Sequence, residues 1–382
     1  MASRTVDVVA AGPPSSDPYD PSVPAWALAG ALAAQGNQVS VLHPATTPGA
    51  APPPGTIEVS VDVPLRRPGA AVEGADFATA AARRLRKNVD LVLRDPAGLG
   101  RLGLHRARNG APVVAVFVRE MELATFDREH TGRAAAGLRD RLDTWRDRRA
   151  VRRLEEAALR EADRLFYDAA RLPADLLREY GIPERRFRAA LPPVPLLPGA
   201  PTRDEARASF RIPADVPVVV ALAAFDQPDP SGIDRAREAF RRVRSFFPGA
   251  RLILVGTTAP PEPGVAVAAD RDGPTFARAL AAADIAIFAR RVPGFDPGVI
   301  LALRAGRCAI VGPAVRLPVD PSLAVRAVPA DDPAEFASVL AELLADPAAR
   351  RLLAGAGERY AAAFDPGRVA EVVTTATLPG AG

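Results

Sequence analysis

The stretch GFDPGVILALRAGRCAIVG, residues 294–312, decides how this chain folds. It follows the apolar run IAIFA (285–289) and ends in a second apolar run, CAIVG. Between these two strand-like runs lies GVILALRAG (298–306), which we expect to be a buried helix. Asp296 followed by Pro297 is typical of a helix start, because aspartate caps free backbone N–H groups and proline suits the first turn. The stretch therefore predicts strand, helix and strand in succession, the repeating unit of an α/β protein.

The same alternation runs along the chain and restarts in its middle. Near the start, the strand-like runs VDVVAAG (6–12) and QVSVLHP (38–44) flank the helical WALAGALAAQG (26–36). The segment LPPVPLLPGAP (191–201) is the best linker candidate, because dense proline suits neither a helix interior nor a central strand. The alternation then resumes at PVVVALA (217–223). This pattern predicts two similar Rossmann-like halves, each with a parallel sheet.

The length of 382 residues and a hydrophobic share of 48% allow each half its own core. We therefore expect an N-terminal domain, a C-terminal domain, and a final segment that packs back on the N-terminal domain. The boundaries follow the linker and the last helical pattern: 1–192, 193–364 and 365–382.

Composition narrows the class of protein. The net charge is +4, but acidic and basic residues are interspersed, so nucleic acid is not expected as a partner. The lone cysteine, Cys308, lies in an apolar run and is expected to be a small buried residue. His43, His105 and His130 show no metal-ligand spacing, and no cofactor is expected. Without an apolar window long enough for a transmembrane helix, or a signal-like start, we predict a cytoplasmic protein.

Several stretches together carry a resemblance to a known family. GFDPGVILALRAG is similar to the signature GFGLPVLEAMACG, aligned without a gap on Gly294, Phe295 and Gly306. LAGALAAQGNQVSVLHP is similar to LARALAARGHEVTVLTP, and residues 332–364 resemble the C-terminal helices of the same family. The chain thus resembles the family-4 glycosyltransferases, which are retaining enzymes. The resemblance implies a GT-B fold, in which two Rossmann-like domains face each other across a cleft and the C-terminal domain holds most of a nucleotide-sugar donor.

The resemblance also marks where the family binds its donor, and those positions have lost their charges here. Two family glutamates, one facing the sugar and one holding the ribose, correspond to Pro293 and Leu301. The family's lysine for the diphosphate corresponds to Ser231, and its arginine to Phe225 or the neighbouring aspartate. On the acceptor side, a polar residue that is usually histidine corresponds to Val118.

The first loop departs from the family as well. A glycine pair normally lets backbone N–H groups approach phosphate there. In this chain the loop reads PPSSDPYDPSVP, where proline offers no N–H and Asp17 and Asp20 repel anions. Loss confined to the ligand site, with the scaffold kept, is the pattern expected of a catalytically retired homologue.

Four charged residues are candidate replacements for the lost groups. Arg290 and Arg291 could bind a diphosphate, or they could belong to an exposed loop. Asp296 could replace a glutamate, although the capping role is the better interpretation. Glu120 follows a strand end, where α/β ligand sites gather, and could serve as an acid or bind a sugar hydroxyl, but surface carboxylates are commoner.

Residues 133–164 predict a long helix rich in arginine and acidic residues. A basic face could rest on anionic lipid, which would make peripheral membrane contact. The interspersed acids favour a solvated helix with internal ion pairs instead. Within it, Leu138, Leu142 and Trp145 recur at helical spacing and are expected to pack on the N-terminal domain.

Three functions remain open from the sequence. The first is a non-catalytic pseudo-glycosyltransferase that binds another glycosyltransferase or pathway protein in polysaccharide or glycoconjugate synthesis. The second is an active glycosyltransferase with relocated donor-binding residues. The third is a small-molecule sensor that uses the interdomain cleft. The missing cations favour the first, with a nucleotide sugar as a weak ligand at most, because a diphosphate without cationic partners is costly to desolvate.

Overall fold

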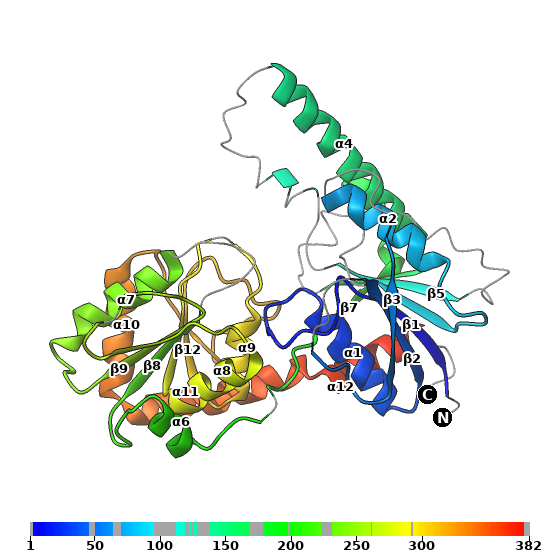
Figure 1. The fold of residues 1–382 in the computed structure, drawn as a ribbon. Coiled ribbons are helices and arrows are strands. Elements are labelled where there is room, and N and C mark those ends of the chain that lie inside the picture. The colour runs from blue at the N-terminus through cyan, green and yellow to red at the C-terminus, as the bar shows by residue number, and fades with distance from the viewer. Residues whose placement is uncertain are drawn as a thin grey trace. The chain divides into compact units, whose positions relative to one another are not determined.

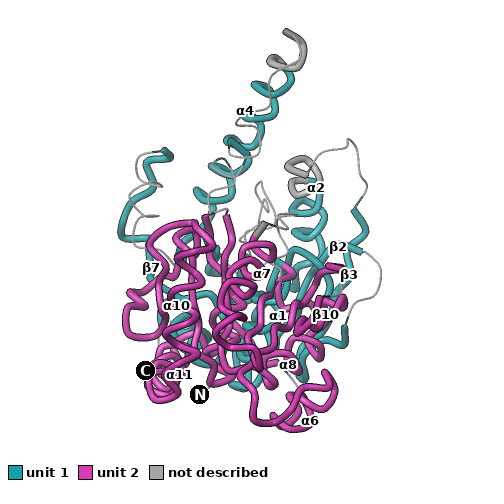
Figure 2. Tube along the Cα trace, turned by 90° about the vertical axis from the view of Figure 1, so that its left-hand side faces the viewer, with its two compact units in different colours: residues 1–15, 21–193, 366–382 teal, residues 16–20, 194–365 magenta. Residues whose placement is uncertain are grey.

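The structure is a computed structural model with two compact units, coloured separately in Figure 2. Unit 1 comprises residues 1–15, 21–193 and 366–382, and unit 2 comprises residues 16–20 and 194–365. Residues 16–20 were expected in the N-terminal domain, but their packing assigns them to unit 2. The structure describes residues 3–45, 50–63, 70–94, 112–118, 123, 126–127, 138–167, 179–197, 199–222, 231–260, 262–291 and 293–377.

Unit 1 is built on a seven-stranded sheet in the order β3-β2-β1-β4-β5-β6-β7, and all of its pairings are parallel (Figure 1). The order reverses between β1 and β4, which is the kind of position where α/β sheets form ligand crevices. The strands are β1 (Thr5–Val9), β2 (Gln38–Pro44), β3 (Thr56–Val61), β4 (Leu91–Arg94), β5 (Val113–Val118), β6 (Arg164–Tyr167) and β7 (Phe187–Ala189).

The first and last helices of unit 1 pack against each other on this sheet. Buried leucines and valines of α1 and α12 share one core with β1 and β4. The Gln35 side chain also donates to the Gly367 carbonyl at 3.2 Å, so the C-terminal helix is fixed at both its start and its apolar face. The helices of this unit are α1 (Val23–Ala34), α2 (Ala70–Ala82), α4 (Leu138–Glu161), the 3-10 turn η1 (Glu184–Arg186) and α12 (Pro366–Thr377).

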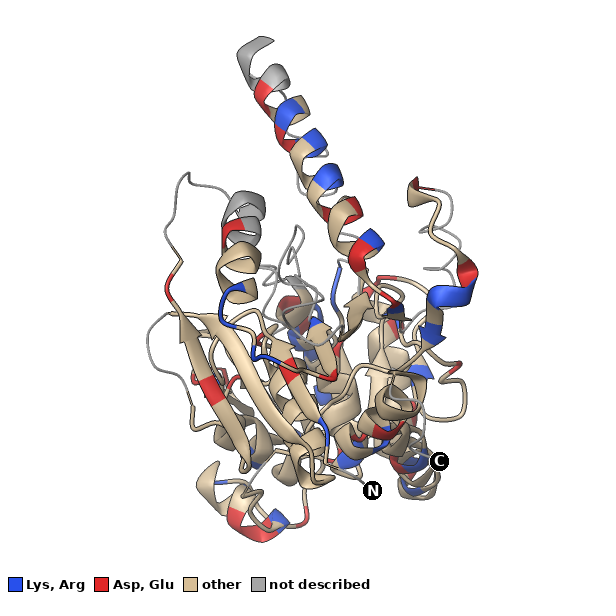
Figure 3. Ribbon diagram, turned by 90° about the vertical axis from the view of Figure 1, so that its right-hand side faces the viewer, with Lys and Arg blue, Asp and Glu red and all other residues tan. Residues whose placement is uncertain are grey.

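Helix α4 carries basic and acidic residues in alternation along its length (Figure 3). Arg160 pairs with Glu156 one turn earlier, and Arg148 pairs with Asp127. The expectation that Trp145 packs on the N-terminal domain is wrong, because its side chain is 56% exposed and lies under the Arg149 guanidinium at 5.4 Å. The side chains of Leu138 and Leu142 lie outside the described residues.

Unit 2 contains a six-stranded parallel sheet in the order β10-β9-β8-β11-β12-β13, again reversing once, between β8 and β11. Its strands are β8 (Val218–Leu222), β9 (Arg251–Val255), β10 (Val265–Ala268), β11 (Ile285–Phe288), β12 (Cys308–Val311) and β13 (Arg326–Ala327). Its helical segments are α6 (Arg203–Ser209), α7 (Ser231–Arg244), α8 (Gly273–Ala282), α9 (Pro297–Arg304), α10 (Pro333–Ala345), α11 (Pro347–Ala361) and η2 (Ala362–Phe364).

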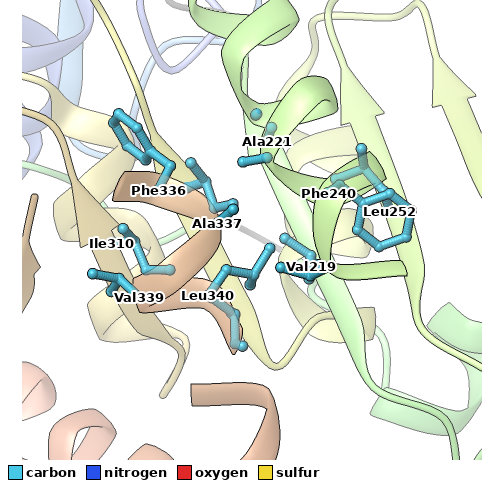
Figure 4. Close-up of a cluster of buried hydrophobic side chains, with 14 of the residues drawn as sticks. Val219, Ala221, Phe240, Leu252, Ile310, Phe336, Ala337, Val339 and Leu340 are labelled. Carbon is cyan, nitrogen blue, oxygen red and sulfur yellow. The ribbon is translucent and has the colours of Figure 1, made fainter. Parts of the chain in front are cut away.

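The core of unit 2 lies where α7 and α10 cover one face of the sheet. Phe240 from α7 and Phe336 and Leu340 from α10 pack with strand residues such as Val219 and Ile310 (Figure 4). All five side chains are buried, as are the continuous apolar strands beneath them. Strands covered on both faces read as unbroken apolar runs, which is why the sequence predicted them well.

Cys308 begins β12 inside this core, as the sequence predicted. Burial raises the pKa of its thiol to about 12, so the reactive thiolate is scarce at neutral pH. We therefore expect a thiol reagent at pH 8 to leave Cys308 unmodified in the native protein and to label it as unit 2 unfolds. Labelling followed by mass spectrometry across a urea series measures this, with Cys308→Ser as the blank. Rapid native labelling would contradict the burial of this side chain.

No helix in the part of the chain that the structure describes combines the length and apolar character needed to cross a bilayer. The cytoplasmic location stays a prediction.

Candidate functional site

The candidate site is the carboxyl edge of the unit 2 sheet, defined here by the loops after β10 (269–272) and β11 (289–296) and by the helix starts that follow them. The loop after β11 is fixed by backbone hydrogen bonds to the segment after β12. Gly294 N–H donates to the Ala314 carbonyl at 3.0 Å, and Arg316 N–H donates to the Gly294 carbonyl at 2.8 Å. The start of α9 is therefore held in one position at this edge.

Asp296 caps α9, as the sequence analysis favoured. Its Oδ1 accepts a hydrogen bond from Gly298 N–H at 3.0 Å, Pro297 occupies the first turn, and the carboxylate is buried. A helix N-terminus carries partial positive charge and free N–H groups, which suit a phosphate. Here the chain's own carboxylate already uses one of those N–H groups and supplies the negative charge.

Tyr19 covers the same helix start. It belongs to residues 16–20 of unit 2, is 6% exposed, and packs its ring at 5.5 Å from the ring of Phe276 in α8. The hydroxyl lies so close to Gly298 that a Cβ at that position would overlap it. Glycine at 298 is therefore required by the position of Tyr19.

The same segment also covers the start of α8. The Ser16 carbonyl would lie 3.1 Å from a Cβ added to Gly273, the first residue of that helix. Asp272 caps α8 by accepting from Thr275 N–H at 2.8 Å. Beside it, burial lowers the pKa of Arg271, while the Asp17 carboxylate opposes that shift and so attracts the guanidinium.

The positions mapped from the family carry no charge at this edge. Leu301 is 4% exposed within α9, Pro293 is exposed in the loop before it, and Ser231 is the first residue of α7. In unit 1, Val118 is the buried last residue of β5. Phe225 lies outside the described residues, as does Glu120.

The two candidate replacement arginines point to different partners. Arg290 donates to the Phe295 carbonyl at 2.7 Å, and its guanidinium lies against Gly294, so it braces the loop after β11. Arg291 is exposed and lies 3.9 Å from Asp331. Each thus has a contact within unit 2, and their role in ligand binding stays a hypothesis.

Arg304, at the end of α9, has a structural role at the ends of the long unit 2 segment. Its guanidinium donates to the Val194 carbonyl and pairs with Asp365 at 2.9 Å. These two residues are the first and last of the 194–365 segment. The arginine therefore joins the two ends of this segment.

The carboxyl edge of unit 1 contains a buried cation that sequence analysis missed. Arg94 ends β4, is almost fully buried, and lies 3.9 Å from Glu161. Burial lowers its pKa to about 10, which still leaves it charged at neutral pH. Nearby, the indole N–H of Trp26 donates to the Gly12 carbonyl at 3.0 Å and fixes the start of the first loop.

Within the described ranges, no three His, Cys, Asp or Glu side chains come together in a way that could hold a metal ion.

Two units with parallel sheets of this kind are consistent with the GT-B fold, and comparison with known proteins agrees. Residues 23–196 match the model of the family described as Glycosyltransferase Family 4. The resemblance to family-4 glycosyltransferases that the sequence predicted is confirmed, and so is the GT-B fold. No curated protein sequence matches the chain significantly.

Solved structures show the same fold over the whole chain at low identity. Sucrose-phosphate synthase from Thermosynechococcus elongatus is 18% identical with a TM-score of 0.72, covering 97% of this chain and 98% of that one. WaaG, a glycosyltransferase involved in lipopolysaccharide biosynthesis, is 17% identical with a TM-score of 0.71, covering 98% of this chain and 100% of its own. Anabaena HepE in complex with UDP and glucose is 12% identical with a TM-score of 0.62, covering 97% and 98%.

Tyr19 and Gly298 were not predicted as partners in the site. A signal was available, because Tyr19 is the single aromatic residue in the loop PPSSDPYDPSVP. The 298 position carries a glycine inside an otherwise apolar helix, which suggests a close approach by another group. Nothing in the sequence connects the two, since they are separated by most of the chain.

Proposed function

We propose that this chain is a pseudo-glycosyltransferase: a GT-B protein that has kept the fold but does not transfer sugar. In this proposal it serves as a binding or assembly partner of a glycosyltransferase or another protein in polysaccharide or glycoconjugate synthesis. Such a pathway is consistent with the similarity to WaaG, since WaaG is a glycosyltransferase involved in lipopolysaccharide biosynthesis.

The proposal rests on one observation: side chains of the protein itself occupy the carboxyl edge of the unit 2 sheet. Asp296 accepts the Gly298 N–H, and the Tyr19 hydroxyl lies against the same glycine. A donor diphosphate placed at this helix start would meet a carboxylate and an aromatic ring. Repulsion by a buried carboxylate opposes anion binding, because little water is present to screen it.

The mapped positions support the same conclusion. A nucleotide sugar needs cations or amides at the diphosphate and a carboxylate at the ribose. Leu301 offers a buried alkyl group where the family has the ribose glutamate, and Pro293 has neither charge nor N–H. Arg290 braces the loop through the Phe295 carbonyl, so using it for a diphosphate would break an existing contact.

We expect the native protein to bind UDP- and GDP-sugars only in the millimolar range or not at all. Isothermal calorimetry against a panel of nucleotide sugars tests this, together with an assay for nucleotide-sugar hydrolysis. An active GT-B glycosyltransferase run under the same conditions serves as the control. A micromolar dissociation constant for any member of the panel would overturn the proposal and favour an active transferase with relocated residues.

A further inference from the structure

Residues 16–20 form a short segment that packs within unit 2, although the chain before and after it belongs to unit 1. Two close contacts and one electrostatic attraction hold it there. The Tyr19 ring packs on Phe276, the Ser16 carbonyl lies against Gly273, and the Asp17 carboxylate attracts Arg271. The segment is therefore docked along its length.

The surface beneath the segment is shaped to receive it. Gly298 lies under the Tyr19 hydroxyl, and Gly273 lies under the Ser16 carbonyl. A Cβ on Gly298 would also press on Phe288 and on the Asp296 carboxylate. A Cβ at either position would crowd the segment, so glycine at both contact points favours a close fit over a chance approach.

The docked segment covers the candidate site at the carboxyl edge of the unit 2 sheet. Its two glycine contacts are the first residue of α8 and the second residue of α9. Both helices begin at the carboxyl ends of parallel strands, where α/β proteins bind their ligands. The segment thus occupies space that a ligand of unit 2 would need.

We propose that residues 16–20 are an intramolecular strap that closes this edge, with the Tyr19 side chain as the plug, so that a nucleotide binds unit 2 only after the strap leaves. This inference rests on the proposed function, because it names the physical barrier to donor binding. The strap also adds to the proposed function, because it makes the barrier to donor binding a part of the chain that can be displaced.

The structure contains a second, separable barrier in Asp296. Its carboxylate repels phosphate but also caps α9 through the Gly298 N–H. Asparagine caps a helix start as well as aspartate does, because its side-chain oxygen still accepts the N–H bond. Asp296→Asn therefore removes the charge and keeps the cap, which allows the plug and the charge to be tested separately.

The experiment compares four forms of the full chain: wild type, Tyr19→Ala, Asp296→Asn and the double variant. Each is titrated calorimetrically with two probes, UDP and p-cresol, which copies the tyrosine side chain. We expect wild type and Asp296→Asn to bind neither. Tyr19→Ala should bind p-cresol, because truncation leaves a slot of the same shape. It should also bind UDP measurably, with a dissociation constant at least about tenfold below the weakest binding that the titration detects, and the double variant should bind UDP more tightly still.

Tyr360→Ala is the matched control for truncating a tyrosine in the same unit. Its hydroxyl donates to the Val319 carbonyl at 3.1 Å, and its ring packs on Phe364. This variant should lose stability without gaining UDP binding. If Tyr19→Ala is too unstable to titrate, Asp17→Ala releases the attraction to Arg271 without making a cavity, and a smaller gain in UDP binding is expected.

The outcomes separate the strap from the proposed function. UDP binding gained by Tyr19→Ala and not by Tyr360→Ala supports the strap. A folded Tyr19→Ala variant that binds UDP no better than wild type overturns it, whether or not p-cresol binds, and leaves the proposed function standing. If the wild-type protein binds UDP-sugars with micromolar affinity, the proposed function is wrong. If Tyr19→Ala then binds them with the same affinity, the strap proposal is wrong as well.

Discussion

Leu301→Glu is expected to lower the free energy of unfolding of unit 2 by about 3 kcal/mol and to restore no activity. Leu301 is 4% exposed inside α9, so the new carboxylate would be buried in an apolar setting. Burial favours the protonated form and raises the pKa of the carboxyl group. The folded state then binds the proton more tightly than the unfolded state, so the loss of stability should grow as pH rises above the unfolded-state pKa, about 4.3.

The measurement uses two kinds of natural reporter, one cysteine and two tryptophans. Cys308 lies in β12 of unit 2, whereas Trp26 and Trp145 both lie in unit 1. The urea midpoint for Cys308 labelling should fall, while the midpoint for tryptophan fluorescence stays near that of wild type. Leu301→Gln is the control, since its loss of stability should not depend on pH. A Leu301→Glu variant as stable as wild type at pH 8 would contradict the burial of this residue.

Adding Pro293→Glu and Ser231→Lys to Leu301→Glu restores the two family carboxylates and one of the two cations, yet we expect no sugar transfer. Tyr19 and Asp296 would still occupy the start of α9. The triple variant should also melt at a lower temperature than the parent. Nucleotide-sugar hydrolysis or transfer by a stable triple variant would show that the site has kept its catalytic arrangement and lost only the charges.

Asp284→Ala should destabilise unit 2 even more, by about 3–5 kcal/mol, because it leaves a buried charge without its partner. The Asp284 carboxylate accepts from Arg207 at 2.9 Å and from Val218 N–H at 2.8 Å. Arg207 is 1% exposed, and burial already lowers its pKa. Without Asp284, this guanidinium keeps bonds to carbonyls such as that of Ala282 but loses the carboxylate that it hydrogen-bonds.

Two matched variants separate the contributions of the hydrogen bond and of the ion pairs to this loss of stability. Asp284→Asn can still accept from Val218 N–H and should cost less than alanine. Arg203→Ala removes the other arginine on the same carboxylate, at 2.6 Å, but that side chain is exposed to solvent, so the loss should stay below about 1 kcal/mol. Cys308 labelling in urea again reports on unit 2. The prediction fails if Asp284→Ala costs no more than Arg203→Ala.

Sequence patterns predicted the elements whose structure depends on neighbouring residues alone. The apolar runs IAIFA and CAIVG became β11 and β12, and Asp296 with Pro297 marked the start of α9. Strand β3 was not predicted, although its segment Thr56–Val61 alternates polar and apolar residues as a half-buried edge strand does, because mainly apolar runs were interpreted as strands. Trp145 was misjudged because helical spacing gives a shared face but does not say whether that face is covered.

For the candidate site, too, the sequence could show some features and not others. The loss of charge at Pro293 and Leu301 is visible in the sequence, since the flanking glycines fix the alignment. The sequence could also show that the first loop lacks the glycine pair. It could not show that Tyr19 lies against Gly298, because that contact joins two segments far apart in the chain.

The sequence by itself determined the α/β class, the order of most strands and helices, and the loss of donor-binding charges, because each depends on residues close together in the chain. Tertiary structure alone decided that residues 16–20 pack in unit 2, that Arg304 joins Val194 to Asp365, and that the start of α9 is filled. The reason is physical: hydrophobic periodicity and capping act over a few residues, whereas a contact across most of the chain depends on the shapes of two surfaces that exist only after folding.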